Sequence, residues 1–134
     1  MIAALYVLLS WVMLMWGVAQ PPLPVVIDDT RVTPDGPAGF ASADRALDGT
    51  PLACHIWIDV TDPWAGRHLS GVLAHEFGHC LLFRFSYYGH FPWPGVMSDA
   101  ETYDRPTADD LLGYHDIAAR ATGHGYTTPM LAAD

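Results

Sequence analysis

The stretch "AHEFGHCLLFRFSYYGHF", residues 74–91, decides how the rest of the sequence is interpreted. It contains three of the chain's seven histidines and one of its two glutamates. Within it, His75, Glu76 and His79 form the pattern H-E-x-x-H. Apolar residues recur at intervals of three and four over residues 72–83, which predicts a helix that carries this pattern.

The H-E-x-x-H pattern has a direct chemical interpretation. Residues four apart lie on the same face of a helix, so His75 and His79 can direct imidazole nitrogens at one ion. Glu76 can reach a water on that ion and act as its general base without being a ligand. Because a catalytic zinc needs three protein ligands, the pattern predicts a zinc site whose third ligand lies elsewhere.

Four segments, "HEFGHCLLF", "GHF", "GVMS" and "PTADDLLGYHDI", resemble the metzincin superfamily of zinc endopeptidases, and its matrixin branch in particular. Those enzymes carry H-E-x-x-H-x-x-G-x-x-H, then a Met-turn and a C-terminal helix. The resemblance covers roughly residues 50–120 and implies an α+β domain that cleaves peptide or protein substrates with zinc. It also implies that Met97 lies in the Met-turn, and that an edge of the sheet pairs with extended substrate.

The third ligand departs from the family spacing. That spacing would place the third histidine at position 85, where this chain has Phe85. A Gly-His pair follows five residues later, at Gly89 and His90. We therefore predict that the helix runs on past Cys80 or that the chain loops out near residues 86–88. In either case Gly89 allows the chain to reverse, and His90 is the third ligand. The alternative ligands are His68, Asp99 and His115.

The chain's two cysteines are predicted to form a disulfide. Alternation in "LACHIWIDV" predicts a strand with Cys54, Ile56 and Ile58 on one face. Cys80 lies on the predicted zinc-binding helix, so the two cysteines can meet where the helix packs on the strand. The alternatives are two buried free thiols, or a thiolate of Cys80 that binds the zinc.

The remaining elements complete a small α+β domain with a mixed sheet. "LPVVIDDT" predicts a strand, and residues 31–51 read as a loop rich in turn formers. Ser70 is the predicted N-cap of the zinc-binding helix. Thr107 and Asp110 form a capping pair at the start of a C-terminal helix, and Gly123 lies past its predicted end.

The N-terminal segment is almost continuously apolar from residue 2 to residue 18, and no charged side chain precedes Asp28. Prolines at positions 21, 22 and 24 separate this run from the rest. We expect residues 1–19 to be a signal peptide or membrane anchor and residues 20–134 to form one domain. The alternative is a buried helix of the domain. The expected location is secreted or membrane-anchored, with the domain outside the cytoplasm.

Composition narrows the function classes. The 134 residues carry a net charge of −9, with six arginines and no lysine. Nucleic-acid binding is not expected, because phosphate neutralisation requires basic clusters. The sequence thus predicts a zinc endopeptidase with ligands His75, His79 and His90 and with Glu76 as base. The alternatives are a non-catalytic metal-binding module of protease fold and a small membrane-anchored structural protein.

Overall fold

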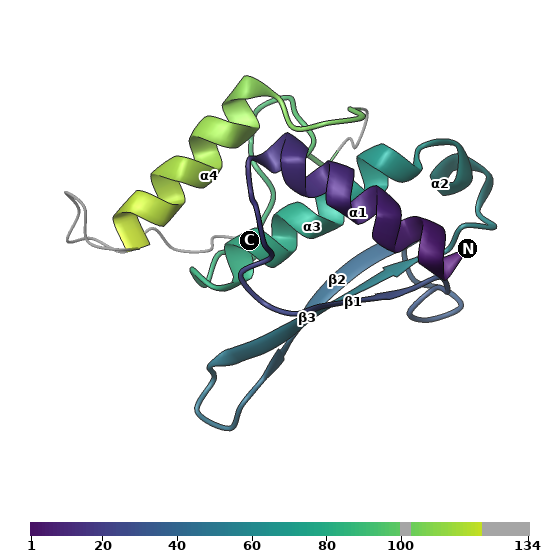
Figure 1. Cartoon of the computed structure of the whole chain (residues 1–134), viewed down its shortest axis with the longest axis horizontal. Coiled ribbons are helices and arrows are strands. Elements are labelled where there is room, and N and C mark those ends of the chain that lie inside the picture. The colour runs from purple at the N-terminus through teal and green to yellow at the C-terminus, as the bar shows by residue number, and fades with distance from the viewer. Residues whose placement is uncertain (100–102, 122–134) are drawn as a thin grey trace.

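A computed structural model describes residues 1–99 and 103–121 of the chain and has an α+β fold, as predicted (Figure 1). The elements, in chain order, are α1 (Ile2–Trp16), β1 (Val25–Asp28), β2 (Gly39–Arg45), β3 (Pro51–Ile58), α2 (Pro63–Arg67), α3 (Leu69–Phe83) and α4 (Ala108–Ala121). Figure 1 shows the helices on one side of the sheet, with α1 lying across α3.

The sheet is mixed and has the strand order β1-β3-β2. Strand β1 pairs parallel to β3, and β2 pairs antiparallel to it. The inner face of β3 carries Cys54, Ile56 and Ile58, all fully buried, which confirms the predicted alternation. Because β3 is central, β1 and β2 are the two edges of this sheet.

Strand β2 lies inside the segment that the sequence analysis took for a loop, so that prediction was wrong. Its residues are mostly small, and small residues have weak strand preference by themselves. Strand structure arises here because the segment pairs with β3, with Ala41 opposite Ile56 and Ala43 opposite Cys54. Burial against a neighbouring strand therefore decides what local preference leaves open.

The starts of two helices differ from the prediction. Ser70 is not the N-cap of α3: His68 holds that position, and the Ser70 hydroxyl donates to the Asp104 carbonyl at 3.0 Å. The short helix α2, which the sequence analysis took for a turn, is capped by Asp62, whose carboxylate accepts from two backbone N–H groups. Carboxylate capping of the first turn explains why so short a helix forms.

The predicted disulfide between Cys54 and Cys80 is present. It joins the central strand β3 to the middle of α3 and closes a sequence separation of 26 residues. Both cysteines are buried. The bond therefore fixes the helix that carries the H-E-x-x-H pattern against the sheet.

Helix α4 begins with the predicted capping pair. The Asp110 backbone N–H donates to the Thr107 hydroxyl at 3.2 Å, and the Thr107 backbone N–H donates to the Asp110 carboxylate at 2.8 Å. Asp110 is fully buried. The same carboxylate accepts from the backbone N–H groups of Val96 and Met97, at 2.7 and 3.3 Å. Gly123 lies outside the described residues.

Helix α1 packs against α3 and belongs to the hydrophobic core, although the sequence analysis left residues 1–19 out of the fold. The Trp16 indole N–H donates to the Ala74 carbonyl of α3 at 3.0 Å. The Tyr6 hydroxyl accepts from the backbone N–H of Ile27 in β1 at 2.9 Å. The inward side chains are Leu5, Leu9, Val12 and Trp16. None of the helices in the described part of the chain has the length and apolar character required to cross a membrane.

Candidate metal centre

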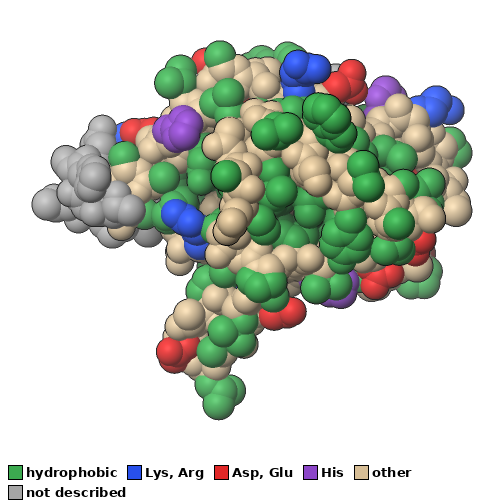
Figure 2. Space-filling model, viewed as in Figure 1, with side chains coloured by type: hydrophobic (Ala, Val, Ile, Leu, Met, Phe, Trp, Pro, Cys, Tyr) green, Lys and Arg blue, Asp and Glu red, His purple; other side chains and the backbone are tan. Residues whose placement is uncertain are grey.

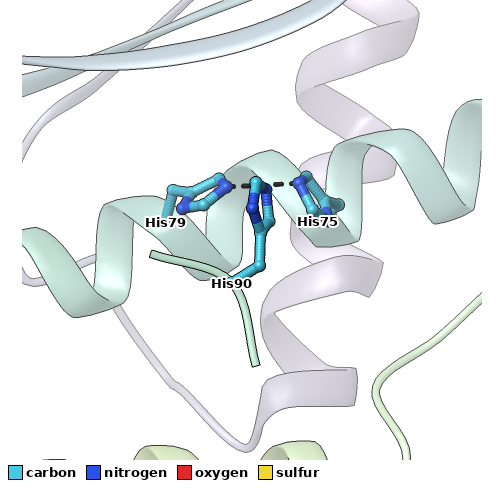
Figure 3. Close-up of side chains that lie close together, drawn as sticks. All are labelled: His75, His79 and His90. Carbon is cyan, nitrogen blue, oxygen red and sulfur yellow. Dashed lines mark hydrogen bonds between the residues drawn. The ribbon is translucent and has the colours of Figure 1, made fainter. Parts of the chain in front are cut away.

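Three histidines converge above the middle of α3 (Figure 3). His75 and His79 come from successive turns of α3, and His90 comes from the loop that follows it. One ring nitrogen of each residue lies within 4.8 Å of the corresponding nitrogens of the other two. The structure thus brings together the three residues that the sequence nominated as metal ligands.

The environment of His75 fixes which of its nitrogens is available. Its Nδ1 lies 2.6 Å from the Val96 carbonyl oxygen. Because a carbonyl can only accept, Nδ1 must carry the proton and donate it. In the neutral ring, Nε2 then carries the lone pair, and it lies 3.2 Å from Nε2 of His79. A backbone partner of this kind is the usual way to orient a metal-binding imidazole.

His90 is oriented in a similar way by a carboxylate. Its Nδ1 lies 2.7 Å from an Asp99 carboxylate oxygen, which is within ion-pair distance. Asp99 was an alternative ligand in the sequence analysis, but it lies behind His90 and its side chain is largely exposed. The other two alternatives are outside the cluster. The His68 ring packs on Trp64, and the His115 ring lies beside Tyr114 on α4.

The chain reaches His90 by a turn that lies just after α3 and before Gly89. Helix α3 runs past Cys80, as predicted, and ends at Phe83. Between α3 and His90, the residue with a positive φ is Ser86, at 57°, whereas the φ of Gly89 is not positive. Immediately after it, the Tyr87 backbone N–H donates to the Leu82 carbonyl at 3.2 Å, which closes the helix end. The reversal therefore follows the helix directly.

His79 has a strongly lowered pKa. Burial lowers its pKa to about 3, and the neighbouring rings of His75 and His90 add to the shift. The physical cause is that a protonated imidazole would lose its hydration in this position. The His79 ring is therefore neutral near pH 7, which is the form that binds a metal ion.

Met97 lies beneath the histidines, where α3 carries a glycine. A Cβ atom at Gly78 would lie 2.3 Å from the Met97 sulfur and 2.8 Å from the Trp16 ring. Met97 is fully buried. Its loop is held from below by Asp110, and a Cβ at Gly95 would lie 2.5 Å from that carboxylate. The glycines thus allow the helix, the methionine loop and α4 to approach one another closely.

Glu76 and the histidines line a cleft of about 560 Å³ between α3 and β2. The cleft residues are Pro37, Gly39, Phe40, Ala41, Ser42, Ala43, Arg45, His75, Glu76, His79, Phe83, Tyr88 and His90. Glu76 is almost fully buried. A Cβ at Gly39 would lie 2.8 Å from its carboxylate, so the start of β2 passes directly beside the glutamate.

Sequence reasoning missed two features of the site. It did not find β2, although this edge strand forms one wall of the cleft. It also did not find that Asp99 and Asp110 hold His90 and the methionine loop. The sequence did predict Asp110 as a capping residue of the C-terminal helix. It did not predict the contact of Asp110 with Val96, because the two residues are 14 positions apart.

No protein-family model, no curated protein and no solved structure matches this chain. Function must therefore be inferred from the chemistry of the site itself.

Proposed function

We propose that the protein is a zinc-dependent endopeptidase of metzincin type. The observation that carries this proposal is the combination of three convergent imidazoles with a buried glutamate in one cleft. A structural zinc site is normally closed by four protein ligands, whereas three ligands leave a position for water or substrate. Among the described residues, the cluster contains three histidines and no cysteine thiolate, which favours the catalytic class of site.

The spacing of His75 and His79 fits zinc. Two imidazole nitrogens that each bind one tetrahedral ion at about 2.0–2.1 Å lie about 3.3 Å apart. Nε2 of His75 and Nε2 of His79 are 3.2 Å apart. Neutral imidazoles are also ligands that zinc binds readily. His75, His79 and His90 would therefore hold the ion, with Val96 and Asp99 orienting two of the rings.

The proposed chemistry is general-base hydrolysis of a peptide bond. Bound zinc would supply an activated water and an electrophile for the scissile carbonyl. The Glu76 carboxylate accepts a proton from the attacking water and later delivers it to the leaving amine. Burial of Glu76 beside Gly39 restricts its position, so that the base needs little reorganisation during the reaction.

The wall of the cleft suggests how substrate is held. Among the described strands, β2 pairs with β3 alone, and its residues line the cleft. An extended peptide can add to such an edge through backbone hydrogen bonds. Backbone recognition of this kind is suited to an endopeptidase, because it uses several residues on either side of the cleaved bond.

We also propose that the domain lies outside the cytoplasm, either secreted or tethered to a membrane through its N-terminal segment. The Cys54–Cys80 disulfide supports this location, because disulfides persist mainly in oxidising compartments. The apolar N-terminal run agrees with an export segment, although α1 lacks the length and apolar character to cross a membrane. Its packing on α3 favours a segment that stays with the domain.

Metal analysis tests the ligand set. The purified protein should contain about one zinc per chain. His90→Ala should weaken zinc binding at least about tenfold, because it leaves two ligands. The matched control is His115→Ala, a histidine on α4 outside the cluster, which should bind zinc as the unsubstituted chain does. Absence of zinc both after purification and after reconstitution would refute the proposed function.

Glu76→Gln tests the catalytic role while keeping the shape of the side chain. The variant should retain its zinc and lose at least about a hundredfold in peptide hydrolysis, the usual contribution of a general base. Hydrolysis of a casein substrate and zinc content are measured on the same preparation. Equal activity of the variant would disprove the mechanism. Zinc binding without hydrolysis in the unsubstituted chain would favour the non-catalytic metal-binding module instead.

A further inference from the structure

One end of the cleft is built from an arginine and an aromatic ring. Arg45 is the last residue of β2, and Tyr88 lies in the turn between α3 and His90. Both residues line the same cleft as the histidines and Glu76. Among the described residues that line it, Arg45 is the single lysine or arginine. A fixed positive charge is therefore present in the proposed substrate site of an otherwise acidic chain.

The Arg45 side chain is held in place by neutral groups. Its guanidinium donates to the Gly49 carbonyl at 2.8 Å and to the Tyr88 hydroxyl. It also lies over the Tyr88 ring, 5.1 Å from the ring centre. The register of β2 against β3 shifts between Asp44 and Arg45. Such a bulge commonly redirects a side chain next to a functional site.

Arg45 differs in its partners from two other arginines of the chain, Arg31 and Arg120. Arg31 forms ion pairs with Asp59 and Asp62. Arg120 forms one with Asp116. Within residues 1–99 and 103–121, no carboxylate lies within ion-pair distance of Arg45.

The guanidinium of Arg45 also has donors to spare. A guanidinium has five N–H donors, and the contacts with Gly49 and Tyr88 use two of them. The remaining donors can bind one more acceptor.

The chemistry of that acceptor follows from the guanidinium group. Arginine presents a planar fork of donors that matches a carboxylate with two parallel hydrogen bonds. A lysine or arginine of a substrate would be repelled by the same charge. An acidic side chain is therefore the ligand that this end of the cleft fits.

Strand geometry places the acidic residue away from the cleaved bond. Gly39 lies beside Glu76, and Arg45 is six residues further along β2. At about 3.3 Å per residue, this distance is about 20 Å along the strand. Antiparallel pairing, the more stable arrangement, makes a substrate run opposite to β2. Its acidic residue would then precede the cleaved bond by several positions.

We infer that Arg45, framed by Tyr88, is a specificity-determining residue that selects peptides with an aspartate or glutamate on the N-terminal side of the cleaved bond. This inference rests on the proposed endopeptidase function of the same cleft. It assigns Arg45 a role in binding substrate, while the histidines and Glu76 carry the chemistry.

Cleavage-site mapping on a mixed peptide library tests the inference. The unsubstituted protein should favour aspartate or glutamate over asparagine or glutamine by roughly tenfold at one position before the cleaved bond, as a charge-assisted contact predicts. Arg45→Gln should remove this preference, and Arg45→Glu should replace it with a preference for lysine or arginine. The matched control is Arg67→Gln, an exposed arginine of α2 outside the cleft, which should leave the preference unchanged.

A binding measurement separates this inference from the proposed function. The zinc-loaded Glu76→Gln protein is titrated with two peptides that differ only by glutamate against glutamine at the selected position, or at each position in turn if no cleavage occurs. Tighter binding of the glutamate peptide that Arg45→Gln abolishes supports the inference, even if no peptide is hydrolysed. Equal binding of both peptides, or a preference that survives Arg45→Gln in a folded protein, overturns it. Circular dichroism of each variant establishes that it is folded. Tyr88→Phe keeps the aromatic ring, so it should weaken the preference for the glutamate peptide less than Arg45→Gln does.

Discussion

Helices α1 and α3 are alike in length and unlike in burial. Each has 15 residues, and neither has a basic residue in its last turn or an acidic one in its first. Helix α3 is buried from Gly71 to Phe83, whereas α1 buries one stripe of four side chains. The outer side chains Val7, Trp11 and Leu14 of α1 are exposed. Figure 2 shows hydrophobic side chains gathered on the face of the molecule where α1 lies.

The more polar of the two helices is the one in the centre. Helix α3 carries His75, Glu76 and His79, yet it lies between the sheet and α1. Buried polar groups are tolerated where they have partners, and His75 has the Val96 carbonyl. The degree to which a helix of this protein is buried therefore depends on its position in the fold and on polar partners for its polar side chains. It does not depend on how apolar the helix is.

The largest loss of stability is expected when α1 is removed altogether. A chain that starts at Gln20 loses four buried side chains, each of which contributes about 1.5–3 kcal/mol. The loss is comparable with the whole stability of a small domain. We expect this chain to be unfolded by circular dichroism and to bind no zinc.

A substitution pair provides the control for this truncation. Leu9→Ala should lower the free energy of unfolding by about 2–4 kcal/mol, because Leu9 is buried against the core. Leu14→Ala, on the exposed face, should change it by less than about 0.5 kcal/mol. A chain from Gln20 that folds and binds zinc would instead show that α1 is dispensable, as expected of a signal peptide.

Removal of the disulfide tests how strongly α3 is held against the sheet. Replacement of both Cys54 and Cys80 by alanine should lower the free energy of unfolding by about 3–4 kcal/mol, since a loop of this length is no longer closed in the unfolded chain. Urea unfolding of the two proteins measures the difference. Because α1 carries no cysteine and packs on α3, its packing should loosen together with α3. An unchanged midpoint would mean that packing alone holds the helix to the sheet.

The smallest expected effect concerns the contact between Gly78 and the methionine loop. Gly78→Ala places a methyl group against Met97 and Trp16, and overpacking of this kind costs about 1–3 kcal/mol. Thermal unfolding measures the loss. In the double variant with Met97→Ala, the two losses should not add, because the smaller side chain makes room for the new methyl group. Simple additivity would show that Gly78 and Met97 are not in contact.

Much of the site could be predicted from local pattern. The helix with the H-E-x-x-H pattern, the β3 alternation that places Cys54 inward, and the Thr107–Asp110 capping pair all depend on neighbouring residues. Local patterns survive folding because the same short-range geometry operates in any fold. The nomination of His90 drew on the resemblance as well. The family spacing places the third histidine at position 85, where this chain has Phe85, and His90 follows five residues later.

Long-range pairing was decided by the tertiary structure alone. Strand β2 has a sequence of small residues and forms because β3 supplies hydrogen-bond partners. The ring of His90 is fixed by Asp99, and the loop of Met97 by Asp110 on another helix. Arg45 meets Tyr88 across 43 residues of sequence.

The sequence by itself determined which residues can bind a metal, which faces of β3 and α3 turn inward, and which cysteines can join. The tertiary structure decided where the cleft lies, which strand forms its wall and which charged side chain lies at its end. The physical reason is that helix and strand periodicity is set by neighbouring residues. A cleft exists only where elements far apart in the chain pack against one another, as β2 and α3 do here.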